Sequence, residues 1–476
     1  MNNHQIEKDI KDLKKFGYVQ ELFRDMGGFS NFAVSFSIIS ILTGTTQLYG
    51  YGLQHGGPLQ MTLGWWVVSI FTLSVAMAMA ELASAYPTAG ALYHWSTFLG
   101  GKTLGWFTAC LNTLGQFAIL AGIDFGLAQF LVGSLQEVLH IPNTALSLNL
   151  VYATLLFSHA LFNHIGIRVV SWLNSFSAWY HIIVVFFILG ALWMKGFAQP
   201  VSFLVHHHQT DGYPPFYSFL VGLLLAQWTL TGYDASAHVT EETVDPRRNA
   251  PWGIVLSVAI SVIAGTILLS AITLSIPDLT QAIGFGDNAL YEIFKLRLGS
   301  SLGTTLILLI AGAMWLCGLA GMTSASRMIY AFARDGGLPF SKVWARVSPS
   351  HRTPSNAIWG LGVFAMGLAV SVSVYSAVVS IATIALYLSY GLPIVARIYL
   401  RWKGTKGEKG PWSLGKFSTL NAIVAVLWIL FISLVFVLPP NEKAGSVMLG
   451  CFIFLFILWF SVARKRFRGP KIGFTK

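Results

Sequence analysis

Two short stretches of the sequence decide the fold, and both contain the tripeptide Leu-Thr-Gly. The first is Ser40-Ile-Leu-Thr-Gly-Thr-Thr-Gln47, and the second is Thr229-Leu-Thr-Gly-Tyr-Asp-Ala-Ser236. Each places Leu-Thr-Gly inside a long apolar segment, with Gly44 and Gly232 separated by 188 residues. Glycine and hydroxyl side chains let a helix unwind, and unwound backbone at membrane depth is tolerated only where it lines a cavity or is buried in protein. Matching interruptions in two halves of a chain indicate a binding site near the bilayer midplane, and close helix packing is the alternative reading.

The composition identifies lipid as the surroundings of these stretches. Of the 476 residues, 55% are hydrophobic and 10% are charged, and the mean hydropathy is +0.65. An ordinary soluble protein has about a quarter of its residues charged, so a soluble globular protein is excluded. Cys110, Cys317 and Cys451 lie inside apolar runs. We therefore expect them to act as small hydrophobic residues, without a disulfide or a cysteine-based metal site.

The apolar segments are long enough for twelve membrane helices, at roughly 20 residues for each crossing. They are expected at 31–53, 63–86, 104–135, 148–166, 173–194, 216–238, 252–275, 302–333, 355–373, 376–398, 418–438 and 444–462. The predicted fold class is an all-α integral membrane protein. The first thirty residues lack the apolar core of a signal peptide, so we expect the first helix to be retained.

The basic residues orient these helices. With the N-terminus in the cytoplasm, 26 of the 30 Lys and Arg residues fall on or near the cytoplasmic side. The exceptions are Lys195, Lys295, Arg297 and Lys443. This asymmetry obeys the positive-inside rule and predicts a multi-pass protein of the cell membrane with both termini cytoplasmic. The net charge of +11 therefore predicts contact with anionic membrane lipids and no nucleic-acid partner.

Three longer motifs carry a family resemblance. They span Ala80–Tyr93, Thr231–Thr243 and Ser326–Gly336, and they resemble the amino acid-polyamine-organocation (APC) permeases. The second motif is most similar to the amino acid/choline transporter group. The resemblance implies a five-plus-five inverted repeat, 31–194 against 216–398, with peripheral helices at 418–462. A cytoplasmic segment at 1–30 and a basic tail at 463–476 would flank this core. The resemblance also implies that the substrate lies between the broken parts of the first and sixth helices.

The two interruptions suit a zwitterion. Unwinding near Thr43–Thr46 would expose the amide groups at the start of a half-helix, whose partial positive charge favours a carboxylate. The sixth helix offers carbonyl groups and the carboxylate of Asp234 to an amine. An acid at this depth must be partnered, solvated or protonated, and a purely structural role for Asp234 stays open. Tyr49, Trp228 and Asn112 are further candidates for the wall of the site. The predicted substrate-binding residues are Thr43, Gly44, Thr45, Thr46, Gln116, Thr231, Gly232, Tyr233 and Asp234.

Coupling and gating are assigned to three further residues. His181, in the helix expected at 173–194, falls where several sodium-independent relatives place a lysine, and a histidine there can bind a proton near neutral pH. A neutral histidine bonded to a carbonyl is the alternative, and sodium coupling through Thr323 or Ser324 is another. Glu81 and Arg327 are expected near the inner ends of their helices, where they would form an inner-gate ion pair.

The predicted function is secondary active transport by alternating access. The substrate is expected to be an amino acid or a related amine such as gamma-aminobutyrate, taken up by proton symport without a metal or cofactor. A solute exchanger, a choline or polyamine carrier and a nutrient sensor are the alternatives. The run Gly100-Gly101-Lys102-Thr103 lacks the first glycine of a phosphate-binding loop, which argues against an ATP-driven pump. No enzyme motif is recognised, and Asp124 and His159 are expected to be structural.

Overall fold

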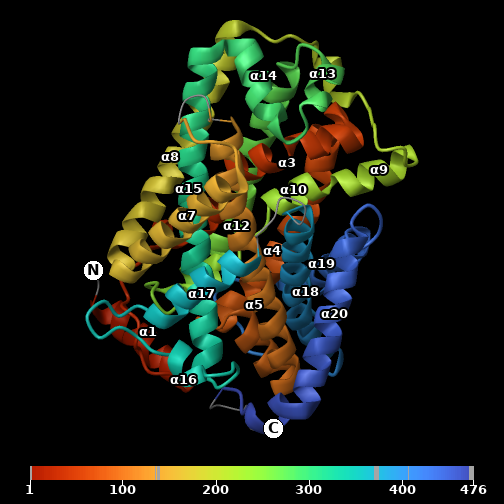
Figure 1. Cartoon of the computed structure of the whole chain (residues 1–476). Coiled ribbons are helices and arrows are strands. Elements are labelled where there is room, and N and C mark those ends of the chain that lie inside the picture. The colour runs from red at the N-terminus through yellow and green to blue at the C-terminus, as the bar shows by residue number, and fades with distance from the viewer. Residues whose placement is uncertain (1–2, 135, 137–139, 369–374, 406, 471–476) are drawn as a thin grey trace.

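The protein is an elongated helical bundle, seen in a computed structural model that describes residues 3–134, 136, 140–368, 375–405 and 407–470 (Figure 1). Within those residues, strand pairing is limited to one isolated parallel bridge between Met26 and Thr243. The long helices are α4 (Trp65–Ala85), α5 (Leu92–Ser134), α7 (Ala145–Ile165), α8 (Ile167–Lys195), α12 (Pro246–Leu274), α15 (Ser300–Arg334), α18 (Tyr375–Trp402), α19 (Ser418–Val435) and α20 (Glu442–Leu458).

Shorter helices complete the bundle and close its ends. They are α1 (Asn3–Lys15), α2 (Gly28–Ile39), α3 (Ile41–Gly56), α9 (Pro215–Gly222), α10 (Leu224–Thr229), α11 (Ala235–His238), α13 (Leu279–Gly284), α14 (Ala289–Leu298), α16 (Ser341–Trp344), α17 (Ser355–Leu368) and α21 (Arg464–Arg466). A π-helical turn, η1 (Gln60–Gly64), leads into α4, and a 3-10 turn, η3 (Gly286–Asn288), joins α13 to α14. The first predicted membrane helix is thus α2 followed by α3, and the sixth is α9, α10 and α11 in succession.

Ten helical stretches of the described chain are long and apolar enough to cross a membrane. Two of the twelve predicted spans are not among them. The segment 216–238 is divided among three helices that are each too short to cross alone. The segment 355–373 corresponds to α17, which has 14 residues, and its remaining positions from 369 lie outside the described residues. The predicted count of twelve therefore exceeds the count by length for two reasons: the sixth span is divided into short helices, and the ninth is described only in part.

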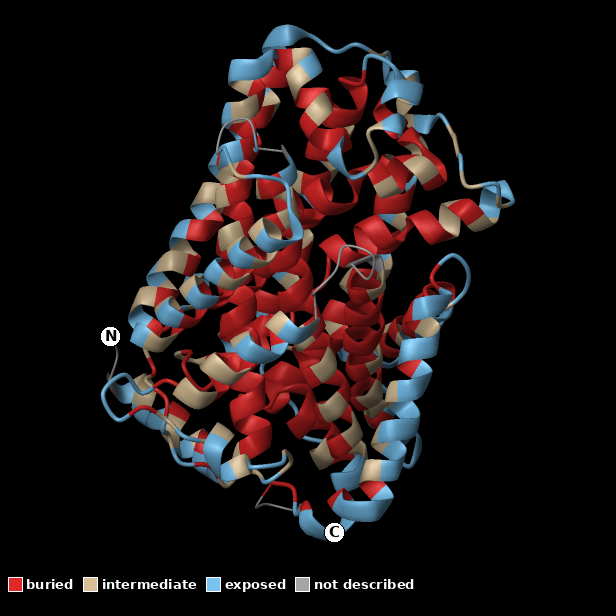
Figure 2. Cartoon of the chain, viewed as in Figure 1, coloured by how far each residue is buried: buried red, intermediate tan, exposed pale blue. Residues whose placement is uncertain are grey.

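The outer helices expose apolar side chains that no part of the described protein covers. Trp172 and Phe186 on α8 are 66% and 69% exposed, and Leu427 on α19 and Phe454 on α20 are both 62% exposed. Figure 2 shows the buried residues concentrated on the central helices, with α20 largely exposed. Large apolar side chains on the outside and a buried interior are expected of a multi-pass membrane protein, in which lipid covers the outer faces.

The bundle has two different ends. One end, the lower one in Figure 1, carries α1, α16 and α21. It is called the basic end below, because these helices contain Lys14, Lys15, Lys342, Arg464, Lys465 and Arg466. The other end carries α13, α14 and the start of α9 and is called the opposite end. The two helix interruptions lie along the bundle between these ends.

Candidate functional site

The first helix interruption is at Ser40, between α2 and α3. Ser40 has φ +22° and ψ +84°, which no helix contains, and its hydroxyl accepts a hydrogen bond from the Thr43 amide at 3.2 Å. Ser40 therefore acts as the N-cap of α3. The break precedes the predicted position, because Thr43–Thr46 lie in the first turns of α3 and are not unwound. The positive end of the half-helix dipole is accordingly at Ile41–Thr43.

The second interruption runs from Leu230 to Asp234, between α10 and α11. Gly232 has a φ of +103°, a conformation that glycine adopts without steric cost. The Thr231 hydroxyl returns to the Gln227 carbonyl at 2.6 Å, and the Tyr233 carbonyl accepts a hydrogen bond from Ser35 of α2 at 2.8 Å. The unwound segment is thus held by α10 on one side and by α2 on the other.

The two interruptions pack directly against each other. A Cβ atom on Gly232 would lie 2.2 Å from Cγ2 of Ile38, and one on Gly44 would lie 2.1 Å from Oγ1 of Thr229. Both distances are far shorter than van der Waals contact. Gly44 therefore serves the close packing of α3 on α10, which is the alternative reading of the glycine pattern, whereas Gly232 serves both the packing and the break.

The Asp234 carboxylate lies fully buried at the end of the second interruption. Its Oδ2 atom accepts hydrogen bonds from Gln116 at 3.0 Å and Asn112 at 3.3 Å, both on α5. Its Oδ1 atom accepts one from the Tyr390 hydroxyl of α18 at 2.9 Å, and His238 of α11 lies 3.2 Å from Oδ2. Side chains from three helices therefore converge on one acid, and the predicted wall residues Gln116 and Asn112 both contact it.

His181 contacts the first interruption. Its Nδ1 atom lies 2.8 Å from the Ser177 carbonyl, so this nitrogen must carry a hydrogen. Its Nε2 atom lies 2.8 Å from the Ser40 hydroxyl. A neutral imidazole satisfies both contacts. Cys317 of α15 also reaches this region, where its thiol donates to the Ile38 carbonyl at 3.3 Å.

The basic end is closed by buried ion pairs. They differ from the predicted pair of Glu81 with Arg327, which is wrong. Arg327 of α15 makes a two-pronged pair with Glu242, with N to O distances of 3.0 and 3.1 Å and both side chains fully buried. Glu81 lies at the end of α4 and pairs with Arg397 of α18 at 3.1 Å. The end of α4, with Glu81, lies beside α18, whereas the end of α15, with Arg327, lies beside the segment that follows α11. Each side chain therefore has a different counter-ion.

A second ion pair lies next to the first. Arg334 contacts both carboxylate oxygens of Glu241, at 2.8 and 3.0 Å. Burial raises the pKa of the Glu241 carboxyl, but the charge of Arg334 and its hydrogen bonds outweigh this, so the pKa lies below its ordinary value. Glu241 and Glu242 are adjacent in the sequence, and Arg327 and Arg334 are seven residues apart, about two helical turns. Both ion pairs therefore connect α15 to the segment that follows α11.

The N-terminal segment covers these ion pairs. The amide of Met26 donates to the Glu242 carbonyl at 2.9 Å, and the Arg24 guanidinium donates to the carbonyls of Thr240 and Thr243. These contacts satisfy carbonyl groups of the turn that follows α11. The N-terminal segment and the sixth predicted helix are thereby joined at the basic end.

Asp335, just beyond α15, gathers three more groups at this end. Its Oδ2 atom contacts Tyr18 at 2.7 Å and Tyr93 and His94 at 3.0 Å. Burial raises the pKa of the Asp335 carboxyl, but the contacts with His94 and Tyr18 and the charge of Arg334 outweigh this, so the pKa lies below its ordinary value. The N-terminal segment, the start of α5 and the end of α15 meet at this carboxylate.

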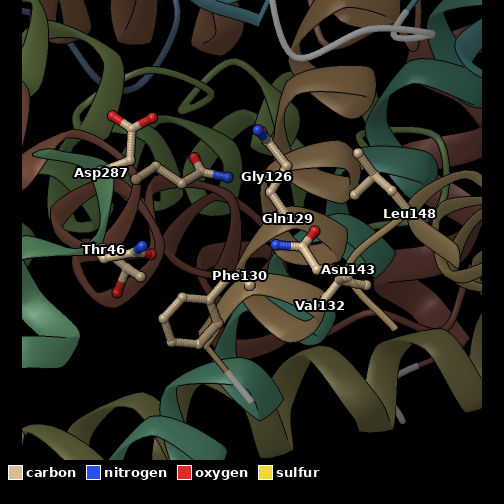
Figure 3. Close-up of a pocket in the computed structure, with 11 residues that line it drawn as sticks. Thr46, Gly126, Gln129, Phe130, Val132, Asn143, Leu148 and Asp287 are labelled. Atoms are coloured by element: carbon tan, nitrogen blue, oxygen red, sulfur yellow. The ribbon is translucent and has the colours of Figure 1, made fainter. Parts of the chain in front are cut away.

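At the opposite end a cavity of about 250 Å³ enters the bundle. Figure 3 shows Thr46 and Asp287 on one side of it and Gln129, Phe130 and Asn143 on the other. The cavity is lined by Thr46, Gln47, Gly126, Gln129, Phe130, Val132, Gly133, Asn143, Leu148, Asp287 and Asn288.

Neutral hydrogen bonds close the inner side of this cavity. Gln47 donates to the carbonyls of Gly122 and Ile123, each at 3.3 Å, and accepts from the Trp228 indole at 3.0 Å. Trp228 stands two residues before the start of the second interruption at Leu230. The cavity is therefore separated from the interruptions by one glutamine and one tryptophan.

Comparison with known proteins identifies the family. A family model described as amino acid permease matches residues 27–462. The chain belongs to the amino acid permease family. The permease is 38% identical to the amino-acid permease BAT1 homolog of Oryza sativa subsp. japonica, across 96% of this chain and 94% of the relative.

Other relatives have similar names. The permease is 37% identical to amino-acid permease BAT1 of Arabidopsis thaliana, across 96% of this chain and 95% of that protein. It is 31% identical to a putative amino acid/polyamine transporter of Macrophomina phaseolina, across 89% and 97% of the two chains. All three relatives are named as permeases or transporters, and they match the permease over nearly their whole length.

Sequence reasoning missed several residues around the interruptions of the permease. His238 follows Asp234 by four residues, which is the spacing of neighbours on one helix face. This spacing would have predicted their contact. Tyr390 is 156 residues from Asp234, and no local pattern connects them. Glu241 and Glu242 belong to one of the family motifs, but nothing in that motif matches them to their partners on α15.

Proposed function

We propose that the permease is a secondary active carrier that imports an amino acid or a related amine, such as gamma-aminobutyrate, by alternating access. Its twelve membrane helices would form a five-plus-five inverted repeat with two peripheral helices. The basic end would face the cytoplasm, as the distribution of Lys and Arg indicates. The observation that carries this proposal is the buried Asp234 carboxylate at one helix interruption, packed against a second interruption.

The chemistry of the two interruptions supports a substrate with separated charges. The first turn of α3 supplies partial positive charge for a carboxylate, and Asp234 supplies a negative charge for an amine. The Thr45 hydroxyl is buried without a hydrogen-bond partner in the described part of the chain, so it is free to bind a polar ligand. Tyr233 and Tyr390, whose ring centroids are 5.3 Å apart, lie beside Asp234 and can face an ammonium group.

The closure of the two ends supports alternating access. In this structure the basic end is shut by ion pairs and by the N-terminal segment, whereas the opposite end holds a cavity that is lined in part by Gln47, whose side chain is hydrogen-bonded to Trp228. A solute would therefore reach the interruptions from the opposite end first. Release to the cytoplasm requires the pairs of Arg327 and Arg334 to separate.

Proton coupling is proposed at the first interruption through His181. The neutral ring accepts from Ser40, whereas a protonated ring would donate at Nε2 and force the Ser40 hydroxyl to reverse. Because Ser40 caps α3, this change acts on the half-helix that faces the substrate. Of the two hydroxyls considered for sodium, that of Thr323 is engaged by Asn163 at 2.9 Å, whereas that of Ser324 is buried without a hydrogen-bond partner in the described part of the chain.

Uptake into proteoliposomes tests this function. Radiolabelled amino acids, gamma-aminobutyrate, choline and polyamines should be supplied with imposed pH or sodium gradients, with and without solute inside. We expect an amine-bearing amino acid to accumulate when the inside is alkaline, and Asp234→Asn to reduce its uptake about tenfold to hundredfold, because a charged hydrogen bond is worth about 1.5–3 kcal/mol. Asp124→Asn removes another fully buried acid, which is paired with His159 of α7, and serves as the matched control.

Two results would contradict the proposal. Normal affinity in the Asp234→Asn variant would remove this acid from the substrate site. Uptake that occurs only with preloaded solute would replace proton symport by exchange.

A further inference from the structure

His238 lies between a backbone carbonyl and the carboxylate of Asp234, which both accept hydrogen bonds when the acid is ionised. Its Nδ1 atom is 3.1 Å from the Ala89 carbonyl, and its Nε2 atom is 3.2 Å from Oδ2 of Asp234. A neutral imidazole has one N–H group and one lone pair. If both residues had their ordinary neutral-pH forms, a lone pair on one ring nitrogen would face an acceptor oxygen at hydrogen-bond distance.

Both contacts become favourable when the pair holds one additional proton. Either the ring is an imidazolium beside a carboxylate, or the ring is neutral beside a protonated Asp234. The two forms have the same net charge of zero, which suits a site where both side chains are fully buried. Without that proton the pair would carry an uncompensated negative charge in the protein interior.

The side chains that contact the Asp234 carboxylate from other helices are neutral donors. From α5 come the amides of Asn112 and Gln116, and from α18 comes the hydroxyl of Tyr390. None of these three groups carries a positive charge that could offset the acid. The positive charge that balances the Asp234 carboxylate must therefore come from the additional proton on the pair of Asp234 and His238.

Charged groups lie further along the chain toward the basic end. Glu241 and Glu242 follow α11, and each is paired with an arginine of α15. His94 is linked to Asp335 and belongs to the neighbouring cluster at the basic end. These groups are engaged with one another, so they do not supply the counter-charge for Asp234.

A second buried imidazole–carboxylate pair, His159 with Asp124, differs from His238 and Asp234 in the number of ring nitrogens that face an acceptor. Nδ1 of His159 lies 3.0 Å from Oδ2 of Asp124, and both side chains are fully buried. Nε2 of His159, however, has no hydrogen-bond partner in the described part of the chain. A neutral ring that donates from Nδ1 satisfies this contact, so no ring nitrogen of His159 is left with a lone pair facing an acceptor, in contrast to His238.

The backbone of one residue connects His238 to the closure of the basic end. The Ala89 carbonyl accepts from His238, and the Ala89 amide donates to Oε1 of Glu241 at 3.2 Å. The same Glu241 oxygen lies 2.8 Å from Arg334. The chain itself provides a second connection, because the four-residue helix α11 begins directly after Asp234 and ends at His238, three residues before Glu241.

We infer that Asp234 and His238 together form a proton-binding site whose occupancy holds the basic end closed. The inference rests on the proposed transport function and locates a coupling proton at the second interruption, independently of His181. A proton from water on the opposite side forms the Nε2–H bond. When the basic end is exposed, this bond breaks, the proton passes to water and the electron pair stays on Nε2.

Loss of the proton changes an attraction into a repulsion. The Nε2 lone pair then faces the Asp234 carboxylate, the contact separates, and α11 shifts together with the Ala89 contact. Because Glu241 is held by Ala89 and Arg334, this shift loosens the ion pairs at the basic end. Proton release and opening toward the cytoplasm are thereby one event.

The test compares His238→Gln with His159→Gln in the full-length chain reconstituted in liposomes, using radiolabelled gamma-aminobutyrate. Glutamine keeps a donor for Asp234 but binds no proton. We expect His238→Gln to lose pH-driven accumulation and to keep exchange of solute down its gradient, whereas His159→Gln should accumulate solute as the wild type does. Accumulation by His238→Gln equal to the wild type, under the same pH gradient, would overturn the inference.

A measurement without any solute separates this inference from the proposed function. Infrared difference spectra of the purified protein between neutral and alkaline pH should contain bands from proton loss by the pair. These bands should be absent from His238→Gln and present in His159→Gln, even if the wild type transports none of the solutes supplied. If His238→Gln does not insert in the membrane, the same bands should be absent from Asp234→Asn, and their persistence there would overturn the assignment.

Discussion

The two ends of the permease are closed by different chemistry. At the basic end, Arg327 pairs with Glu242 and Arg334 with Glu241, and the first of these pairs is fully buried. At the opposite end, Gln47 bridges Trp228 and two carbonyls of α5 through neutral hydrogen bonds of 3.0–3.3 Å. A neutral hydrogen bond contributes about 1 kcal/mol, whereas breaking a buried ion pair by removing one partner costs about 3–5 kcal/mol. The difference indicates that the opposite end opens more readily than the basic end.

The largest effect should come from removing one charge of the buried pair. Arg327→Met leaves Glu242 unpaired in the interior, so we expect the stability to fall by about 3–5 kcal/mol. Thermal unfolding of the purified protein, followed by size-exclusion chromatography, measures the change. The double variant Arg327→Met/Glu242→Gln removes both charges and should recover most of the stability. A single variant as stable as the wild type would show that this pair does not hold the basic end.

A substitution at the second interruption should rank next. Gly232→Ala forces an alanine into a left-handed conformation and places its Cβ 2.2 Å from Ile38, and unfavourable backbone conformations cost about 1–3 kcal/mol. Uptake should be lost because the two interruptions can no longer pack together. Gly321→Ala is the matched control, since its Cβ would be 3.7 Å from the nearest atom. Equal uptake by the Gly232 and Gly321 variants would contradict the close contact of the interruptions.

Weakening the opposite end should have a smaller effect. Gln47→Leu removes the bridge to Trp228 and to α5, at a cost of about 1–3 kcal/mol for the groups left unpaired. We expect the protein to remain folded and the cavity to open more often. A cysteine introduced as Asn288→Cys, in the lining of the same cavity, should therefore react faster with a thiol reagent when Gln47 is replaced. Destabilisation as large as that of Arg327→Met would remove the contrast between the two ends.

The pH response of the basic end should be the smallest effect near neutrality. The pKa values of Asp335 and Glu241 lie below their ordinary values, so both acids contribute stability above the ordinary carboxyl range, at about pH 4. This contribution is lost only as the pH falls through the lowered pKa values. The difference in unfolding temperature between Asp335→Asn and the wild type should therefore stay constant from neutral to mildly acidic pH. A difference that changes over this range would contradict the lowered pKa.

Sequence reasoning located the two interruptions but not their details. The repeated Leu-Thr-Gly led to both places, because glycine is needed wherever backbones approach closely or take a left-handed conformation. The same pattern gave the wrong position in the first helix, since Gly44 is used for packing on Thr229 and the break itself is at Ser40. A serine that caps a half-helix has no signature distinct from a serine within a helix.

Side-chain contacts between residues far apart in the chain could not be predicted from the sequence. Glu81 and Arg327 each needed a counter-ion, but Arg397 and Glu242 are their partners because of how helix ends meet in space. Asp234 was recognised from its rarity at membrane depth, whereas its contact with α18 depends on the approach of a distant helix. His238 could have been found from its spacing to Asp234 alone.

The most direct test of the account is the accessibility, from the two sides, of Thr46, a predicted substrate-binding residue of α3 that lines the cavity. A cysteine is introduced as Thr46→Cys in a protein whose native cysteines are replaced, and labelling by a membrane-impermeant thiol reagent is measured with the reagent outside or inside. Gln129→Cys, on α5 in the lining of the same cavity, is the control for access to the cavity itself. The account predicts labelling of Thr46→Cys from the outside that transported solute slows, and no labelling from the inside until Arg334 or Glu241 is replaced. Labelling from the inside in the otherwise unchanged protein would contradict it.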